Sequence, residues 1–409
     1  MNRRTRRAPH AVPADDGCVG VYLHVPFCER VCPYCDFAVV AARPLTPARE
    51  AAYLDALETE LAQRAPGFAR PGGGPRALAS VYLGGGTPSL LAPESVARLV
   101  AAARAHFPAG GRVEITLELN PGTTERARLP GFRAAGVNRL SIGVQSFSDA
   151  TLKRLGRAHR AGEAHATLAA ARAAGFDDVS LDLIVAAPGQ RLADLERDLD
   201  AVLAFGPEHV SAYQLTIEPG TPFARAAARG QLALADEDEG AAMLERLAAR
   251  LAAGGLERYE ISSFARPGRE ARHNRRYWER QAVLGIGMGA WSCEPASPAA
   301  PHGARRANVR QLDTYLARMA AGEPAAAAPP ERLTPETARG EAAFLALRTA
   351  RGLDAAAFAA EFGAPPRAFW PEVIAEALAG GWLLESASGD LRLTPAGLLL
   401  SDSIFERLV

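Results

Sequence analysis

Residues 22–37 read YLHVPFCERVCPYCDF and place three cysteines in a short loop directly after an apolar, β-branched run. Cys28, Cys32 and Cys35 follow a C-x3-C-x2-C spacing. Thiolates are the usual protein ligands of iron–sulfur clusters, and this loop can present three sulfurs to three corners of a cubane. Because no fourth cysteine lies nearby, the pattern predicts a [4Fe-4S] cluster with one open iron. Such an iron can chelate the amino and carboxylate groups of S-adenosylmethionine (SAM), which would supply the difficult chemistry.

A zinc site is the main alternative for the same loop. Zinc also takes sulfur and nitrogen ligands, so the three cysteines could bind it together with His24 or another residue. The C-x2-C pairs typical of zinc folds are missing, which disfavours this interpretation. The remaining cysteines, Cys18 and Cys293, are scattered along the chain and do not resemble a disulfide framework. We therefore expect a reducing, cytoplasmic location.

Alternating strand-like and helix-like runs predict a parallel α/β fold for the first half of the chain. The predicted strands are residues 20–25, 78–83, 113–119, 137–144, 179–185 and 210–217. The predicted helices between them include residues 48–64, 94–106, 163–174 and 192–204. Six repeats indicate a partial (β/α)6 barrel that resembles a TIM barrel but stops short of eight units.

Polar residues fall near the carboxyl ends of these strands, where active sites of such barrels lie. The first strand leads into the cysteine loop and the second into GGGTP at residues 84–88. The later strands carry Glu118, Gln145, Asp182 and Thr216 near their ends. Each residue alone could be an ordinary cap or turn. Their repeated placement instead favours one site at the barrel mouth.

The rest of the chain predicts further units. The expected divisions are a disordered basic tail at 1–17, the barrel at 18–225, a barrel extension with the HNRRYW segment at 226–320, a linker at 321–336, and a C-terminal winged-helix-like domain at 337–409. The Ala- and Pro-rich composition of the linker marks the boundary. The C-terminal domain has no basic cluster, so we expect a packing or lid role without nucleic acid.

Composition narrows the possible partners. The 46 basic and 46 acidic residues give no net charge, which provides no argument for an extended nucleic-acid or anionic-membrane surface. No run of 18 or more apolar residues is present, so we expect no transmembrane segment. The basic opening lacks the apolar stretch of a secretory signal.

Several motifs together carry a family resemblance from about residue 20 to the end of the chain. The motifs are YLHVPFCERVCPYCDF, YLGGGTPSLL, ELNPGT, RLSIGVQSF, LKRLGRAH, YQLTIEPGTP, HNRRYW and LTPAGLLLSDSIF. The sequence resembles the radical SAM family that contains oxygen-independent coproporphyrinogen III oxidase and a heme-chaperone branch. The resemblance implies a [4Fe-4S] cluster and SAM as cofactors, with the cluster on the three cysteines.

The resemblance also implies roles for individual residues around SAM. The implied contacts are Tyr22, Tyr34, Gly85, Gly86, Thr87, Glu118, Gln145, Arg157, Asp182, Thr216 and Trp291. The two tyrosines would line the pocket, and the glycines and Thr87 would bring bare backbone against the methionine end, where a side chain would collide. Gln145 and Asp182 suit the ribose hydroxyls, Glu118 a polar contact and Arg157 a carboxylate. Thr216 and Trp291 would contact the adenosine.

Two features favour the heme-chaperone branch over the oxidase branch. Oxidases that resemble this chain carry a fourth cysteine two positions after the third, and this chain has Phe37 there. The segment HNRRYW matches the HNxxYW pattern that the resemblance links to heme, which implies heme contacts at His273, Asn274, Tyr277 and Trp278. The alternative is a buried aromatic cluster around a hydrogen-bonded histidine.

The resemblance therefore implies a heme chaperone with a radical SAM core, an acceptor protein for the heme and an electron donor. The alternative function is the anaerobic oxidase itself, which decarboxylates coproporphyrinogen III to protoporphyrinogen IX in porphyrin biosynthesis. Two places depart from the family pattern. Val185, Ala186 and Ala187 stand where relatives usually have a bulkier, more polar segment, and Trp291 stands where many relatives have histidine. Both departures concern the walls of the expected chamber.

Overall fold

A single large sheet organises the chain, and the computed structural model describes residues 15–70 and 72–409. Most of the predicted basic tail therefore lies outside the described residues. Six parallel strands form the centre of the sheet in chain order: β1 (Cys18–Val25), β4 (Ala77–Gly85), β5 (Ala109–Leu119), β6 (Arg139–Gln145), β7 (Val179–Val185) and β8 (His209–Gln214). They confirm the six predicted strands, with ends that shift by a few residues.

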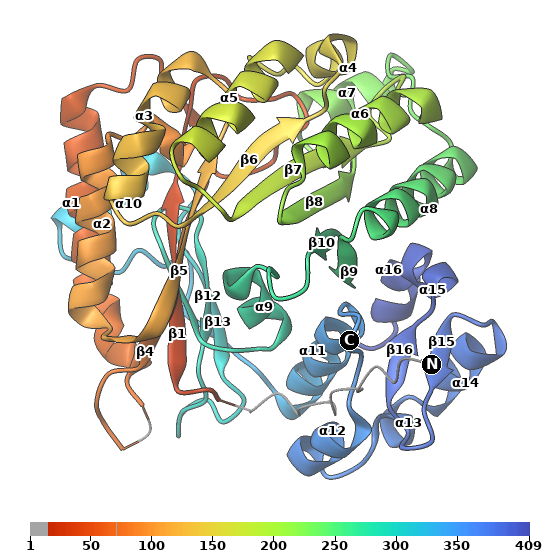
Figure 1. Cartoon of the computed structure of the whole chain (residues 1–409). Helices are drawn as coiled ribbons and strands as arrows, with labels where there is room; N and C mark the ends of the chain where they lie inside the picture. The colour runs from red at the N-terminus through yellow and green to blue at the C-terminus, as the bar shows by residue number, and fades with distance from the viewer. Residues whose placement is uncertain (1–14, 71) are drawn as a thin grey trace.

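Helices cover the convex face of this sheet (Figure 1). They are α1 (Pro47–Arg64), α2 (Pro93–His106), α3 (Thr123–Ala134), α5 (Ala161–Ala173) and α6 (Leu192–Phe205). All but α3 correspond to predicted helices. The helix α3 is absent from the prediction because it carries Pro130 in its interior and few apolar side chains, both unusual for a helix.

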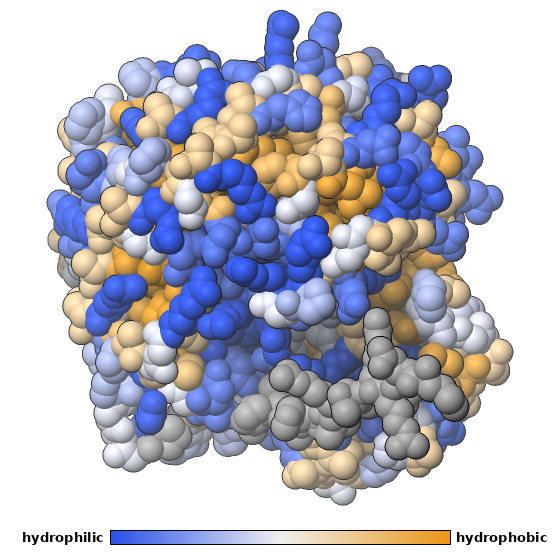
Figure 2. Space-filling view, viewed as in Figure 1, coloured by the Kyte–Doolittle hydropathy of each residue, from blue (hydrophilic) through white to orange (hydrophobic). Residues whose placement is uncertain are grey.

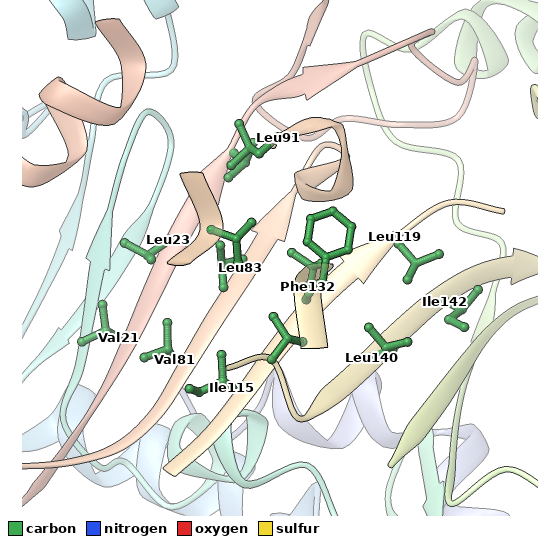
Figure 3. Packing of buried hydrophobic residues seen from close by; sticks show 14 of the residues in the cluster. Val21, Leu23, Val81, Leu83, Leu91, Ile115, Leu119, Phe132, Leu140 and Ile142 are labelled. Carbon is green, nitrogen blue, oxygen red and sulfur yellow. The ribbon is translucent and has the colours of Figure 1, made fainter. Parts of the chain in front are cut away.

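The two faces of the parallel strands differ in polarity. Apolar side chains such as Leu23, Leu83 and Ile142 point outward and pack under the helices (Figure 3). Burying each contributes about 1.5–3 kcal/mol relative to exposure. The alternate residues point into the concave side, and many of them are polar, such as Glu118 and Asp182. The hydrophobic core therefore lies between sheet and helices, and the lumen face of the sheet carries polar side chains.

Further strands extend both edges of the sheet without closing it. One edge adds β11 (Val283–Ile286), β12 (Trp291–Glu294), β13 (Ala304–Ala307) and β14 (Glu331–Arg332), and the other adds β10 (Ser263–Ala265) and β9 (Glu257–Glu260). The sheet order runs from β14 to β9, so the barrel stays open, as predicted. The segment predicted as a linker at 321–336 contains β14, which pairs with β13.

The C-terminal part has its own small core. It consists of α11 (Pro335–Leu347), α12 (Ala355–Phe362), α13 (Pro366–Phe369), α14 (Pro371–Ala379), the hairpin β15 (Leu383–Glu385) and β16 (Leu391–Leu393), and then α15 (Pro395–Leu399) and α16 (Ser401–Phe405). Phe358, Ile374 and Leu391 belong to its hydrophobic cluster. Helices followed by a two-stranded hairpin confirm the winged-helix-like prediction.

The surface mixes hydrophilic and apolar side chains. Figure 2 shows hydrophilic residues gathered across the middle of the face seen in Figure 1. Among the helices of the described residues, none combines the length and apolar character that a membrane span requires.

Candidate cofactor site at the barrel mouth

The cysteine loop is fastened to the glycine turn that follows β4. The amide of Gly86 donates to the carbonyl of Val25 at 2.8 Å, and the amide of Thr87 donates to that of Phe27 at 2.7 Å. Within the loop, the amide of Cys35 donates to the carbonyl of Cys32 at 3.1 Å. The short strands β2 (Phe27–Cys28) and β3 (Val40–Ala41) pair and close the loop at its base. The two predicted motifs therefore lie side by side at the carboxyl ends of β1 and β4.

The glycines of this turn are required by the protein itself. Gly85 has φ +113°, and a Cβ there would lie 2.5 Å from the ring of His24. A Cβ on Gly86 would lie 2.7 Å from the carbonyl oxygen of Phe27. The family resemblance implied a collision with the cofactor. The contacts within the chain already exclude a side chain at both positions, because they bring the turn against the cysteine loop.

Burial shifts the pKa of two cysteines of the loop. Burial raises the pKa of Cys28 to about 11, although the hydroxyl of Thr87, 3.8 Å from its sulfur, opposes the shift. Burial also raises the pKa of Cys35. The guanidinium of Arg157 lies 3.5 Å from the sulfur of Cys32. The thiols of Cys28 and Cys35 are therefore neutral at pH 7 in the apo protein, and iron binding would have to release their protons.

The arrangement of the cysteines bears on the zinc alternative. Within residues 15–70 and 72–409, no three His, Cys, Asp or Glu side chains are grouped to hold one metal ion. A zinc site needs its ligands around a single point. The thiolates of a cubane bind different irons and need not meet at a point. The nearby Thr87 and Arg157 provide donors to the sulfurs of Cys28 and Cys32, and hydrogen bonds to sulfur are typical of iron–sulfur sites.

Three polar side chains converge above Gly143 of β6. A Cβ on Gly143 would lie 2.9 Å from Asn120 Oδ1, 2.9 Å from Gln145 Nε2 and 3.3 Å from Arg157 Nη2. Arg157 also donates to Asn120 and to the carbonyl of Gly143. Asn120 in turn donates to the hydroxyl of Thr87 at 2.9 Å. Hydrogen bonds thus connect the predicted SAM contact Arg157 to the cysteine loop, and the amide of predicted contact Gln145 lies next to them above Gly143.

A cavity of about 270 Å³ opens beside this network. Its lining includes Cys32, Thr87, Asn120, Arg157 and the first residues of α3. The cavity therefore adjoins one sulfur of the cysteine loop and the donors around it. It gives the site an opening lined largely by polar groups.

Buried carboxyl groups form a second cluster in the lumen. Glu118 accepts hydrogen bonds from the hydroxyl of Tyr82 at 2.8 Å and from the amide of Gly85 at 3.0 Å. Burial raises the pKa of Glu118 to about 7, and neighbouring Asp182 adds to the shift. Asp182 accepts from Ser141, and burial raises its pKa as well. Glu118 is therefore only partly ionised near pH 7, and burial favours the protonated form of Asp182.

The two predicted tyrosines occupy different parts of the site. The hydroxyl of Tyr34 lies 3.5 Å from Nη1 of Arg157, so this side chain joins the cluster side. The hydroxyl of Tyr22 lies 3.1 Å from Nδ1 of His24, whose Nε2 lies 2.8 Å from the carbonyl oxygen of Ala38. Burial lowers the pKa of His24 to about 4, so this histidine is neutral. It braces the glycine turn.

Two predicted contacts, Thr216 and Trp291, lie on exposed parts of the structure. Thr216 is exposed beyond the end of β8. Trp291 begins β12 and is 57 % exposed. The segment Val185–Ala187, which departs from the family pattern, is buried. Ala186 has φ +56°, so the small side chains there belong to a tight turn.

His273 lies in the floor of the barrel. It is 1 % exposed, on α9 (Arg272–Trp278), and its ring nitrogens lie 2.9 Å from the hydroxyl of Ser80 and 3.5 Å from that of Tyr277. Its ring centroid is 5.1 Å from that of Tyr82. Burial lowers the pKa of His273 to about 3. This geometry agrees with the alternative of a hydrogen-bonded histidine in an aromatic cluster.

The other HNxxYW residues lie toward the C-terminal domain. Asn274, Tyr277 and Trp278 are half-buried. The guanidinium of Arg348 stacks 4.3 Å from the Trp278 ring, and Arg280, just after α9, pairs with Glu361 at 2.9 Å. The helix α9 therefore reaches from the barrel floor to the C-terminal helices.

Sequence reasoning missed Asn120, Tyr82 and Gly143 as parts of the site. Asn120 stands in the quoted motif ELNPGT, one residue beyond the end of β5, so the strand-end rule could have identified it. Tyr82 and Gly143 lie on lumen-facing positions of β4 and β6, which the alternation of each strand could have indicated.

Comparison with known proteins places these features in a family context. The model of the Radical SAM superfamily matches residues 22–202, and the model of the HemN C-terminal domain matches residues 333–400. The chain is 38 % identical to the protein named heme chaperone HemW of Mycobacterium tuberculosis, over 98 % of this chain and 97 % of that protein. It is 33 % identical to the heme chaperone HemW of Bacillus subtilis, over 94 % and 97 %.

The solved structure of coproporphyrinogen III oxidase (HemN) from Escherichia coli, described as a radical SAM enzyme, has the same fold. It superposes with a TM-score of 0.79 at 24 % identity, covering 96 % of this chain and 90 % of that chain. The similarity extends over the barrel and the C-terminal domain together. At this level of identity it establishes the fold.

Proposed function

Because this chain belongs to the heme chaperone HemW family of radical SAM proteins, we propose that it binds a [4Fe-4S] cluster and SAM at the barrel mouth, and that it binds heme for transfer to an acceptor protein. The observation that carries the proposal is the joining of the cysteine loop to the glycine turn beside Asn120, Gln145 and Arg157. A reducing compartment such as the cytoplasm suits these free thiols.

The residues of the site have distinct proposed tasks. Cys28, Cys32 and Cys35 hold the cluster, and Thr87 and Arg157 donate to its sulfurs. When bound, the cluster and SAM together supply one-electron chemistry. Hydrogen bonds to the sulfurs are one of the factors that set the potential of such a cluster. Asn120 keeps both donors in place, because it contacts each of them.

The remaining polar groups form the proposed SAM pocket. The carboxyl groups of Glu118 and Asp182 accept from the polar groups of SAM, and the amide of Gln145 provides a further contact. Tyr82 orients Glu118 by donating to it. The pocket therefore matches the donors of SAM mainly with buried acceptors.

The pKa of Glu118 leads to a test of its role. We expect SAM affinity to increase as pH rises through about 7, because the ionised carboxylate is the better acceptor. If only the carboxylate form contributes, affinity at pH 6 is lower by up to about tenfold. Binding titrations between pH 6 and 8.5 measure this dependence. Glu118→Gln should flatten it, and the variant also corrects for titration of SAM itself.

The raised pKa of Glu118 has the opposite effect on the stability of the apo protein, which decreases as pH rises. The folded pKa of Glu118, about 7, lies above its ordinary value of 4.5. The stability contributed by the protonated carboxyl is therefore complete below about pH 4.5 and is lost as pH rises through about 7.

The binding titrations can also contradict the proposed role of Glu118. If SAM binding by Glu118→Gln depends on pH in the same way as binding by the unmodified protein, Glu118 does not belong to the pocket.

Heme binding through His273 requires a change in the barrel floor. Ser80 and Tyr277 occupy both of its ring nitrogens, so α9 must move before the imidazole can ligate iron. We expect added hemin to give a protein-bound Soret band, with a simultaneous change in the fluorescence of half-buried Trp278. His273→Ala should weaken or shift that band, and an identical hemin titration would exclude His273 as the ligand.

An assay of porphyrinogen conversion distinguishes the heme-chaperone proposal from the oxidase alternative. Phe37 stands where the oxidase branch has a fourth cysteine, so we expect no conversion of coproporphyrinogen III by the reconstituted protein with SAM and reductant. The hemin titration on the same anaerobic sample provides the positive counterpart. Sustained formation of protoporphyrinogen IX would overturn the chaperone proposal in favour of the enzyme.

A further inference from the structure

The turn that presents Gln145 is strained. Gln145 ends β6 with φ +62°, in the left-handed region that non-glycine residues seldom adopt. The amide of Ser146 donates to the carbonyl of Val144 at 2.8 Å, which closes a three-residue turn around Gln145. Turns of this kind with positive φ are rare, and such strain costs about 1–3 kcal/mol. Surrounding contacts must therefore hold the turn.

Asp198 of α6 supplies those contacts. Its carboxylate accepts from the hydroxyl of Ser146 at 2.8 and 3.0 Å and from the amide of Phe147 at 2.7 Å. On the other side of the turn, Nε2 of His159 lies 3.1 Å from the carbonyl oxygen of Val144. Both residues following Gln145 are thus fixed from a helix on the convex face of the sheet.

The surroundings of Asp198 indicate that its role is to hold this turn. Asp198 is 2 % exposed and has no salt-bridge partner anywhere in the described part of the chain. Burying a carboxylate without an ion pair is costly unless hydrogen bonds compensate. Ser146 and Phe147 provide that compensation. The need to hold the strained turn at Gln145 explains why a carboxylate is buried at this position.

We propose that Asp198 is a positioning residue, which holds the strained turn so that the amide of Gln145 lies above Gly143, on the same side as Asn120 and Arg157, at the proposed SAM pocket. The inference rests on the proposed SAM binding. The inference assigns a part in the site to a residue whose side chain does not itself reach the barrel lumen. Without Asp198 the turn relaxes toward ordinary backbone, and Gln145 leaves the position above Gly143.

The test measures SAM affinity in anaerobically reconstituted full-length protein. We expect Asp198→Ala to bind SAM about tenfold more weakly, the ratio that corresponds to 1.4 kcal/mol of released strain. Iron and sulfide content should stay unchanged, because the cysteine loop is untouched. Asp198→Asn should restore most of the affinity, since its amide can still satisfy Phe147 and Ser146. Asp200→Ala, on the exposed side of the same helix, is the control.

A double-mutant cycle separates positioning from a general structural role. If Asp198 acts through Gln145, Asp198→Ala has little further effect on SAM affinity in a Gln145→Ala background. Equal and additive losses would overturn the inference, as would an Asp198→Ala variant with the affinity of the unmodified protein. Should Asp198→Ala fail to fold, Ser146→Ala removes the hydroxyl that donates to Asp198 and accepts from the amide of Ser148, and it leaves the contact of Asp198 with Phe147 in place. If the unmodified protein binds no SAM, the proposed function fails instead.

Discussion

Cys32→Ala is expected to abolish the cluster. The reconstituted unmodified protein should hold about four irons and four sulfides per chain, whereas the variant should retain almost none and lose the brown colour. Two thiolates cannot hold a cubane from a loop this short, and Arg157 would lose the sulfur that lies 3.5 Å from it. SAM binding should disappear together with the cluster, because the open iron provides its chelation.

Cys293→Ala is the matched control for this loss. Cys293 lies on β12, away from the loop, and its thiol is half-buried. This variant should keep its iron, sulfide and SAM binding. Full iron and sulfide in Cys32→Ala would contradict the cluster assignment, and zinc without sulfide in the unmodified protein would restore the zinc alternative.

Glu60→Ala is expected to destabilise the barrel by about 3–5 kcal/mol, the usual cost of leaving buried polar partners uncompensated. Glu60 is fully buried on α1. It accepts from the amide of Gly287 at 2.8 Å, from Asn308 at 2.7 Å and from the hydroxyl of Tyr315 at 2.9 Å. Removing the carboxylate takes an acceptor from each of these donors and from Arg64, which lies 3.4 Å from it, and it opens a cavity.

Denaturant unfolding of the apo protein measures this effect. Glu58→Ala on the same helix is the control, because Glu58 pairs with partly exposed Arg98 and its loss should change stability by less than about 1 kcal/mol. Glu60→Gln should fall between the two, since its carbonyl oxygen still accepts. An unfolding midpoint of Glu60→Ala equal to that of Glu58→Ala would show that the network does not stabilise the barrel.

Much of the barrel could be predicted because local sequence and tertiary environment agree there. The strands are short, apolar runs and lie between Ala-rich amphipathic helices, so both signals indicate a parallel sheet. The helix α3 escaped prediction because of Pro130 and its weak apolar stripe. The pairing of β14 with β13 was also unforeseen, because Ala- and Pro-rich composition at 321–336 does not reveal that two residues complete a sheet edge.

The candidate site was predictable where residues adjacent in sequence create it. The cysteine loop and the glycine turn each show their chemistry within a few positions. The convergence of Asn120, Gln145 and Arg157 above Gly143 arises only when strands and loops that are distant in sequence come together, which spacing does not reveal. Likewise, nothing in HNRRYW shows that His273 faces Ser80 across the barrel floor.

The helix α9 has a mechanical consequence. It has seven residues, so it spans about 10 Å, and it is short enough to move as one rigid rod. One end is fixed by His273 against Ser80, and the other by Trp278 against Arg348. Displacing the imidazole of His273 therefore also disturbs the contacts that α9 makes with the C-terminal helices. The free energy needed to move α9 out of the barrel floor thus includes contacts from both parts of the chain.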